Sequence, residues 1–118
     1  MNSKSARKTG LASQGSRIRY LPCRAEPGMF KGELLVYIAG FVPAKKGPKI
    51  EAQLLVDEHE VAELAGAPKR NQPSKGWLRV TLLAEVEGMA EVILPQPAQP
   101  LGERILIEAK ELRETAGG

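Results

Sequence analysis

Aromatic residues are scarce in this chain, and their scarcity limits both its core and its ligands. Phe, Trp and Tyr together make up 4% of the 118 residues, while the hydrophobic share is an ordinary 42%. We therefore expect a small core built from Leu, Val, Ile and Ala. Few rings also count against binding single-stranded nucleic acid by base stacking, because stacking needs exposed aromatic side chains.

The residue types on which most catalytic and metal sites depend are almost absent. Cys23 is the only cysteine and His59 the only histidine. No intramolecular disulfide can form, which fits a reducing compartment. A zinc site would need more His or Cys ligands, and only His59 could activate Cys23 as a nucleophile. We interpret Cys23 as a half-buried strand residue and His59 as a solvated residue at a helix start.

Other signatures are missing as well. The chain has no Walker loop, no dinucleotide fingerprint and no apolar run of about 20 residues that would suggest a transmembrane helix. Its first residues lack the apolar segment of a secretory signal, while their Arg and Ser content leaves an organellar transit peptide as an alternative. Glu85, Glu87 and Glu91 fit solvated strand glutamates better than acid–base machinery. We predict a cytoplasmic protein that is not an enzyme, with no catalytic residue, no metal and no cofactor.

What the chain does have is a segregated set of basic residues. Six of its seventeen Lys and Arg lie in the first 24 residues, where there is no acid. Two further clusters occupy Gly/Pro-rich stretches, 43–49 and 66–76. Removing the six N-terminal charges from the net charge of +3 leaves −3, so the rest of the chain is slightly acidic. A cationic tail and two cationic loops on such a body favour a surface that faces a polyanion.

Alternating apolar residues predict strands along most of the chain. One face of the segment 77–86 carries Leu78, Val80, Leu82, Ala84 and Val86, and Glu87-Gly88 is a candidate tight turn after it. Asp57 and Glu60 have the spacing of a capping box, which predicts a helix of about two turns over 58–65. The predicted strands are 17–24, 31–40, 50–56, 77–86, 89–94 and 104–109.

This order predicts a single all-β domain with mainly antiparallel pairing. We expect a small barrel of five to six strands, OB-like or SH3-like, with one short helix after the third strand; a small sandwich is an alternative. The domain should span 17–112. We expect the basic segment 1–16 to be disordered and 113–118 to be a flexible C-terminal tail.

The basic clusters lead to a hypothesis of nucleic-acid binding. In it, a small accessory protein contacts the phosphates of DNA or RNA through its tail and loops, with little base specificity. Trp77, directly after the second loop, is the best residue for stacking, although it could equally cap the core. The predicted ligands are Lys45, Lys46, Lys49, Lys69, Arg70, Lys75, Trp77, Arg79, Arg17 and Arg19.

The alternative hypothesis is an assembly module. A small barrel of this kind could be one subunit of a larger complex or of a homo-oligomer, docking on protein through its strand edges. The Pro-rich segment 95–100 (PQPAQP) could then contact a partner as an extended stretch. It could also be a plain crossover between strands.

Overall fold

The computed structural model describes residues 17–43 and 47–115 as a sheet protein with almost no helix. The predicted tail 1–16, Lys45, Lys46 and residues 116–118 lie outside the described residues. Two 3-10 turns, η2 (Glu58–Glu60) and η3 (Ala109–Glu111), follow β3 and β7. The strands are β1 (Ile18–Pro27), β2 (Glu33–Gly40), β3 (Ile50–Asp57), β4 (Val61–Ala62), β5 (Ser74–Val86), β6 (Met89–Ala98) and β7 (Gly102–Glu108).

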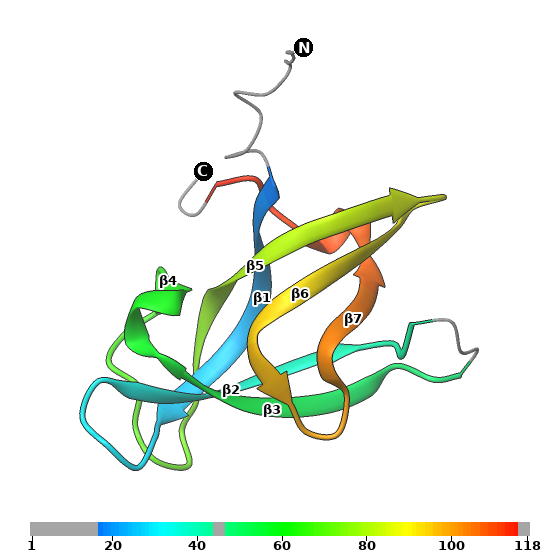
Figure 1. The fold of residues 1–118 in the computed structure, drawn as a ribbon. Coiled ribbons are helices and arrows are strands. Elements are labelled where there is room, and N and C mark those ends of the chain that lie inside the picture. Colours follow the sequence, from blue (N-terminus) through cyan, green and yellow to red (C-terminus); the bar gives the residue numbers. More distant parts are fainter. Residues whose placement is uncertain (1–16, 44–46, 116–118) are drawn as a thin grey trace.

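All the strands pair antiparallel in one sheet, in the order β3-β2-β1-β5-β6-β7, with β4 added to β5. The sheet curls on itself into a half-barrel (Figure 1). Single backbone bridges between Phe41 and Leu106 and between Gln53 and Gln99 draw its two ends together. The predicted all-β, mainly antiparallel and barrel-like fold is therefore confirmed. Residues 17–43 and 47–115 contain seven strands rather than five to six, since the two-residue β4 leaves no periodic signal.

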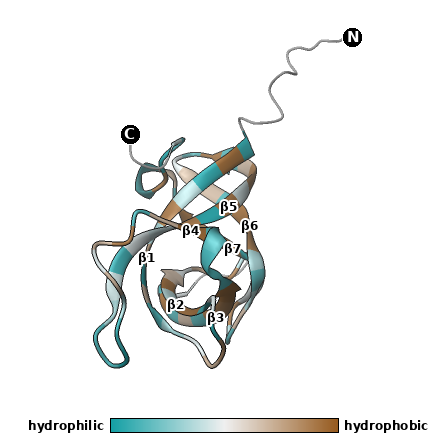
Figure 2. Cartoon of the chain, turned by 90° about the vertical axis from the view of Figure 1, so that its left-hand side faces the viewer, coloured by the Kyte–Doolittle hydropathy of each residue, from teal (hydrophilic) through white to brown (hydrophobic). Residues whose placement is uncertain are grey.

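The core is aliphatic, as the composition predicts. Alternate residues of β1, β2 and β3 are buried, and Figure 2 shows the corresponding bands of hydrophobic and hydrophilic residues along the strands. The largest fully buried side chains are Leu21, Leu78, Leu94, Ile105, Ile107, Val36, Val80 and Val92. Within the described residues, no helix is both long and apolar enough to cross a membrane.

The predicted apolar face of β5 is wrong beyond Leu82. A bulge shifts the pairing with β6, so that Leu82 lies opposite Val92 while Ala84 lies opposite Glu91. One extra residue on β5 reverses which side chains point inward. Ala84 and Val86 are consequently exposed, and Val86 keeps 66% of its accessible surface.

The predicted helix over 58–65 is also wrong in length. Asp57 does cap a turn, and its side chain accepts a hydrogen bond of 2.9 Å from the backbone N–H of His59. The turn ends after Glu60, because Val61 and Ala62 pair with Leu78 and Trp77 as β4. The backbone bonds that would continue the helix are thus replaced by bonds to the sheet.

The remaining boundaries are close to those expected. Glu87 and Gly88 form the predicted two-residue hairpin turn, both with positive φ, at 53° and 82°. β6 continues into the Pro-rich segment as far as Ala98, and β7 begins two residues earlier than predicted. Arg113, beyond the predicted end of the body, exchanges two backbone hydrogen bonds with Tyr20, at 2.9 and 3.0 Å.

Candidate nucleic-acid interface

The two predicted basic loops leave the sheet at opposite ends. The loop that contains 44–46 joins Gly40 to Ile50, which are paired at the far end of β2 and β3. The other loop leads into Ser74, which lies opposite Ala25; Ala25 in turn lies opposite Val36, in the first half of β2. In Figure 1 the ends of β2 and β3 next to the first loop and the loop before β5 lie on opposite sides. Within the described residues, the two loops therefore do not approach each other on one face of the protein.

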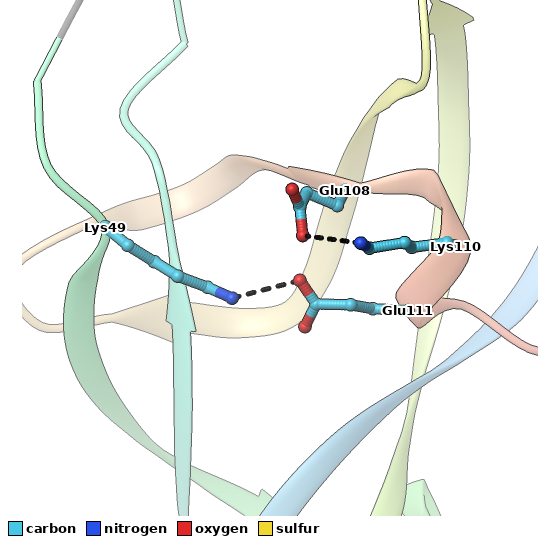
Figure 3. Close-up of polar contacts among 4 residues, drawn as sticks. All are labelled: Lys49, Glu108, Lys110 and Glu111. Carbon is cyan, nitrogen blue, oxygen red and sulfur yellow. Dashed lines mark hydrogen bonds and ion pairs between the residues drawn. The ribbon is translucent and has the colours of Figure 1, made fainter.

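Lys49 is engaged in an ion pair. Its Nζ lies 3.0 Å from a carboxylate oxygen of Glu111, and the two side chains are only 40% and 25% exposed (Figure 3). This contact ties the start of β3 to η3. A more exposed pair, Lys110 with Glu108 at 3.9 Å, lies beside it. Lys49 would have to give up Glu111 before it could bind a phosphate.

Lys69 and Arg70 lie in the turn of the second loop and are exposed. The turn is closed by backbone hydrogen bonds between Lys69 and Gln72, one of them 2.9 Å long, and Asn71 adopts a positive φ of 63°. Asn tolerates this left-handed conformation better than most residues do. Both cations therefore stand on an ordered turn.

The sequence predicts Arg17 and Arg19 as ligands of the same surface as Arg79. In the fold they do not share the face of Arg79. Arg19 alternates along β1 in step with the buried Leu21, so it belongs to the inward side at the end of the barrel, whereas Arg17 precedes β1 and is exposed. Arg17 Nη1 donates to the carbonyls of Leu82 and Leu83, at 3.2 and 3.0 Å, beside the β5 bulge. Arg19 Nη1 donates to its neighbour, the Ile18 carbonyl, at 3.0 Å.

Six outward residues of β1 and β5 form a continuous surface, which we call the β1–β5 strip. Along each strand they alternate with the buried residues, so their side chains face outward. The register places them directly across from one another, as the pairs Tyr20–Arg79, Pro22–Trp77 and Arg24–Lys75. Three of the predicted ligands, Lys75, Trp77 and Arg79, are thus brought together, with Arg24 added. Strand alternation alone could have indicated Arg24, since Tyr20 and Pro22 share its face.

A cleft opens beside the strip where β1 and β2 separate. Their pairing ends at Arg24–Tyr37, after which the end of β2 turns to β7 through Phe41. The resulting β1–β2 cleft has a volume of about 480 Å³. It is lined by Pro22, Cys23, Arg24, Tyr37, Ile38, Ala39, Glu51, Lys75, Gly76, Trp77 and Glu111. It combines two aromatic rings with two cations and two acids.

Two arginines lie over the rings of the cleft: Arg24, which lines it, and Arg113, which does not. The guanidinium of Arg24 lies 6.0 Å from the centre of the Tyr37 ring and 4.0 Å from a carboxylate oxygen of Glu51. The guanidinium of Arg113 lies 3.9 Å from the centre of the Trp77 ring. Arg113 is not among the predicted ligands, because only the fold brings the C-terminal segment to β1. Desolvation, followed by the carboxylate of Glu26, raises the pKa of Tyr37, while Arg24 opposes the shift.

The other chemical groups lie outside the cleft or are inaccessible. Burial raises the pKa of the Cys23 thiol to about 12, so the thiol is protonated at neutral pH and a poor nucleophile. His59 is bonded to Asp57 on the exposed turn η2. Glu91 accepts a hydrogen bond of 3.0 Å from Arg104. Among the described residues, no group of three or more His, Cys, Asp or Glu is arranged to hold a metal ion.

Comparison of the chain with protein-family models, with curated proteins and with solved structures found no match.

Proposed function

We propose that this protein binds single-stranded nucleic acid without catalysis, along the β1–β5 strip and the β1–β2 cleft. The bound strand would place phosphates at Arg24, Lys75 and Arg79 and bases against Trp77 and Tyr37. The proposal keeps the accessory role and the phosphate contacts inferred from composition. It moves the proposed phosphate contacts from the loops to the sheet. It also adds base stacking, against the expectation from the scarce aromatic residues, because Trp77 and Tyr37 line one cleft. The lone cysteine fits action in the cytoplasm.

The observation that carries the proposal is the direct cross-strand pairing of Arg24 with Lys75. Like charges that face each other directly across two strands destabilise a sheet. Arg24 is paired only loosely, with Glu51, whose side chain is 86% exposed and has a carboxylate oxygen 4.0 Å away. A phosphate between the two cations would relieve their repulsion. Trp77, next to Lys75 on the same face, offers a ring to the adjoining base.

The fold type that fits this proposal is an OB-like barrel rather than an SH3-like one. Its support is that β1 pairs with both β2 and β5, that β5 pairs with β6, and that β3 approaches β6 through the Gln53–Gln99 bridge. OB-type barrels bind oligonucleotides on a sheet face. The chain departs from the five-stranded pattern by β7 and by the small β4.

Binding of a fluorescent mixed-sequence oligonucleotide of about 16 nucleotides, measured by anisotropy against salt concentration, tests the proposal. The double variant Arg24→Ala/Lys75→Ala should bind weakly, with a salt slope shallower by about 1.4, since each lost contact to a single strand removes about 0.7. Arg104→Ala, a cation of β7 that pairs with Glu91, is the matched control and should leave the slope unchanged. No binding by the wild type at low salt would refute the proposal.

An assembly module is the second candidate, and one observation favours it. A groove of about 340 Å³ between β3 and β6 contains no charged residue; it is lined by Leu35, Gln53, Leu54, Leu55, Gln96, Pro97 and Gln99. Leu55 is 43% exposed there. An uncharged groove of leucine, proline and glutamine suits a protein partner better than a phosphate chain. Light scattering should then show an oligomer that Leu55→Asp converts to a monomer; a monomeric wild type that captures no protein partner would exclude this candidate.

A further inference from the structure

Two large apolar side chains stand in solvent at the turn between β1 and β2. Met29 is 83% exposed and Phe30 is 72% exposed, more than any other large hydrophobic residue in the described part of the chain. They are neighbours in the turn, residues 28–32. Isolated exposed apolar residues are ordinary, but an adjacent pair at a projecting turn is typical of a contact surface.

The turn is held in one shape. The Glu33 carboxylate accepts hydrogen bonds from the backbone N–H groups of Met29 and Phe30, at 2.9 and 3.3 Å. Two backbone bonds, Gly28 N–H to the Glu33 carbonyl and Glu33 N–H to the Phe30 carbonyl, are 2.8 and 3.0 Å long. A Cβ at Gly28 would meet the Glu33 side chain at 2.7 Å, so this packing needs glycine. Because the turn is preorganised, its exposed side chains can bind a partner at low entropic cost.

Exposed cations lie at the same end of the sheet as the two apolar side chains. Lys31 follows Phe30 and is exposed. The loop before β5 leaves the sheet at the same end, since Ser74 lies opposite Ala25 near the end of β1 (Figure 1). This loop carries the exposed Lys69 and Arg70. We call the set Met29, Phe30, Lys31, Lys69 and Arg70 the apolar–basic tip.

We infer that the apolar–basic tip is a second contact for the nucleic acid that binds the β1–β5 strip. Met29 and Phe30 stack on or wedge between bases, while the three cations contact phosphates. Apolar side chains in such positions can separate stacked bases, and rings stack on single-stranded ones. The inference rests on the proposed function and extends its site past Arg24 to the end of β1.

Charge and continuity favour this occupant over two others. A second copy docked tip to tip would bring Lys31, Lys69 and Arg70 against the same three cations, and such repulsion disfavours a symmetric dimer. An anionic lipid surface would satisfy the cations, but it could not follow the strip. Arg24 and Lys75 lie opposite each other close to the Ala25–Ser74 end of the ladder, so one extended polyanion can contact both surfaces.

A tryptophan reporter tests the stacking contact. Trp77 is the only tryptophan, so Phe30→Trp in a Trp77→Phe background places a single fluorophore at the tip. Its emission should be quenched by the oligonucleotide but not by inorganic polyphosphate, which has charge without bases. Separately, Met29→Ala/Phe30→Ala should weaken oligonucleotide binding about tenfold or more without changing the salt slope. Val86→Ala, which trims another exposed apolar residue, is the control and should bind normally.

The outcomes separate the inference from the function on which it rests. If the wild type binds and the double alanine variant binds equally well, the tip is not a contact, although the strip remains one. If the wild type does not bind at low salt, the proposed function fails and the tip inference with it. The inference is also overturned if the double variant loses self-association, or binding to anionic lipid vesicles, while its oligonucleotide affinity is unchanged.

Discussion

The guanidinium of Arg113 stacks on the ring of Trp77, 3.9 Å from the ring centre. The same residue exchanges two backbone hydrogen bonds with Tyr20. Through these contacts the C-terminal segment lies against Tyr20, at one end of the β1–β5 strip, and against Trp77, in its middle pair. A base that stacks on Trp77 must therefore use the ring face that Arg113 leaves free, or displace Arg113. The C-terminal segment occupies the edge of β1 that β2 leaves free.

Replacing Arg113 by Ala should therefore destabilise the fold slightly and change the emission of Trp77. Cation–π contacts at exposed sites contribute about 0.5–1 kcal/mol. Denaturant unfolding followed by tryptophan fluorescence measures both effects. Lys110→Ala, which removes an exposed cation of the same segment, is the control. Equal stability and equal emission for the two variants would show that the stack is absent in solution.

Two leucine substitutions of the same chemistry should differ sharply in their effect on stability. Leu78 is 0% exposed in the centre of β5, whereas Leu55 is 43% exposed on β3. Leu78→Ala should lower the free energy of unfolding by about 2–5 kcal/mol, because it leaves a cavity. Leu55→Ala should change it by no more than about 0.5 kcal/mol. Urea denaturation of both variants checks the expectation, which similar losses would contradict.

The Asp57–His59 contact should make a small contribution to stability that depends on pH. The hydrogen bond to Asp57 and its charge raise the pKa of His59 above 6.5, so this contribution is present below pH 6.5 and lost as the pH rises through the raised value. The backbone N–H of His59 is the main cause that lowers the pKa of Asp57 below 3.8. That contribution is present above pH 3.8 and lost as the pH falls through the lowered value. The pair should stabilise most between pH 3.8 and 6.5.

The measurement is an NMR titration of the single histidine. Asp57→Asn should return the pKa of His59 toward 6.5, because it weakens the hydrogen bond that is the largest cause of the shift and removes the charge that is the second. Glu58→Gln is the matched control, since the charge of Glu58 is a smaller cause, and it should move the pKa less. Identical titration curves for the wild type and Asp57→Asn would disprove the contact.

Local patterns were sufficient to predict most of the strands. Leu34, Val36 and Ile38 alternate in sequence and are all buried, and the two-residue turn at Glu87-Gly88 forms as expected. The bulge could not be predicted, because Leu82 and Leu83 are both apolar and fit the inward face in either register. β4 could not be predicted either, since two residues define no period and their pairing with β5 is a tertiary contact.

The candidate site was predictable only in part, for a related reason. Lys75, Trp77 and Arg79 alternate on one segment, so their common face follows from strand geometry alone. Their proximity to Arg24 depends on the pairing of β1 with β5. The proximity of Arg113 to Trp77 depends on the bridge between Arg113 and Tyr20. Loop composition likewise marked Lys49 and Lys69 as exposed cations, but it did not show that their loops leave opposite ends of the sheet.

The two single bridges that draw the half-barrel together also protect the protein from aggregation. β3 and β7 are the outermost strands of the sheet order, and unpaired outer strands are templates for pairing with other chains. Gln53 on β3 and Leu106 on β7 use their backbone groups within the molecule, through Gln99 and Phe41. Loosening either bridge would free backbone donors and acceptors on an outer strand. Slow self-pairing into β-rich aggregates is then the expected failure of this fold when it is destabilised.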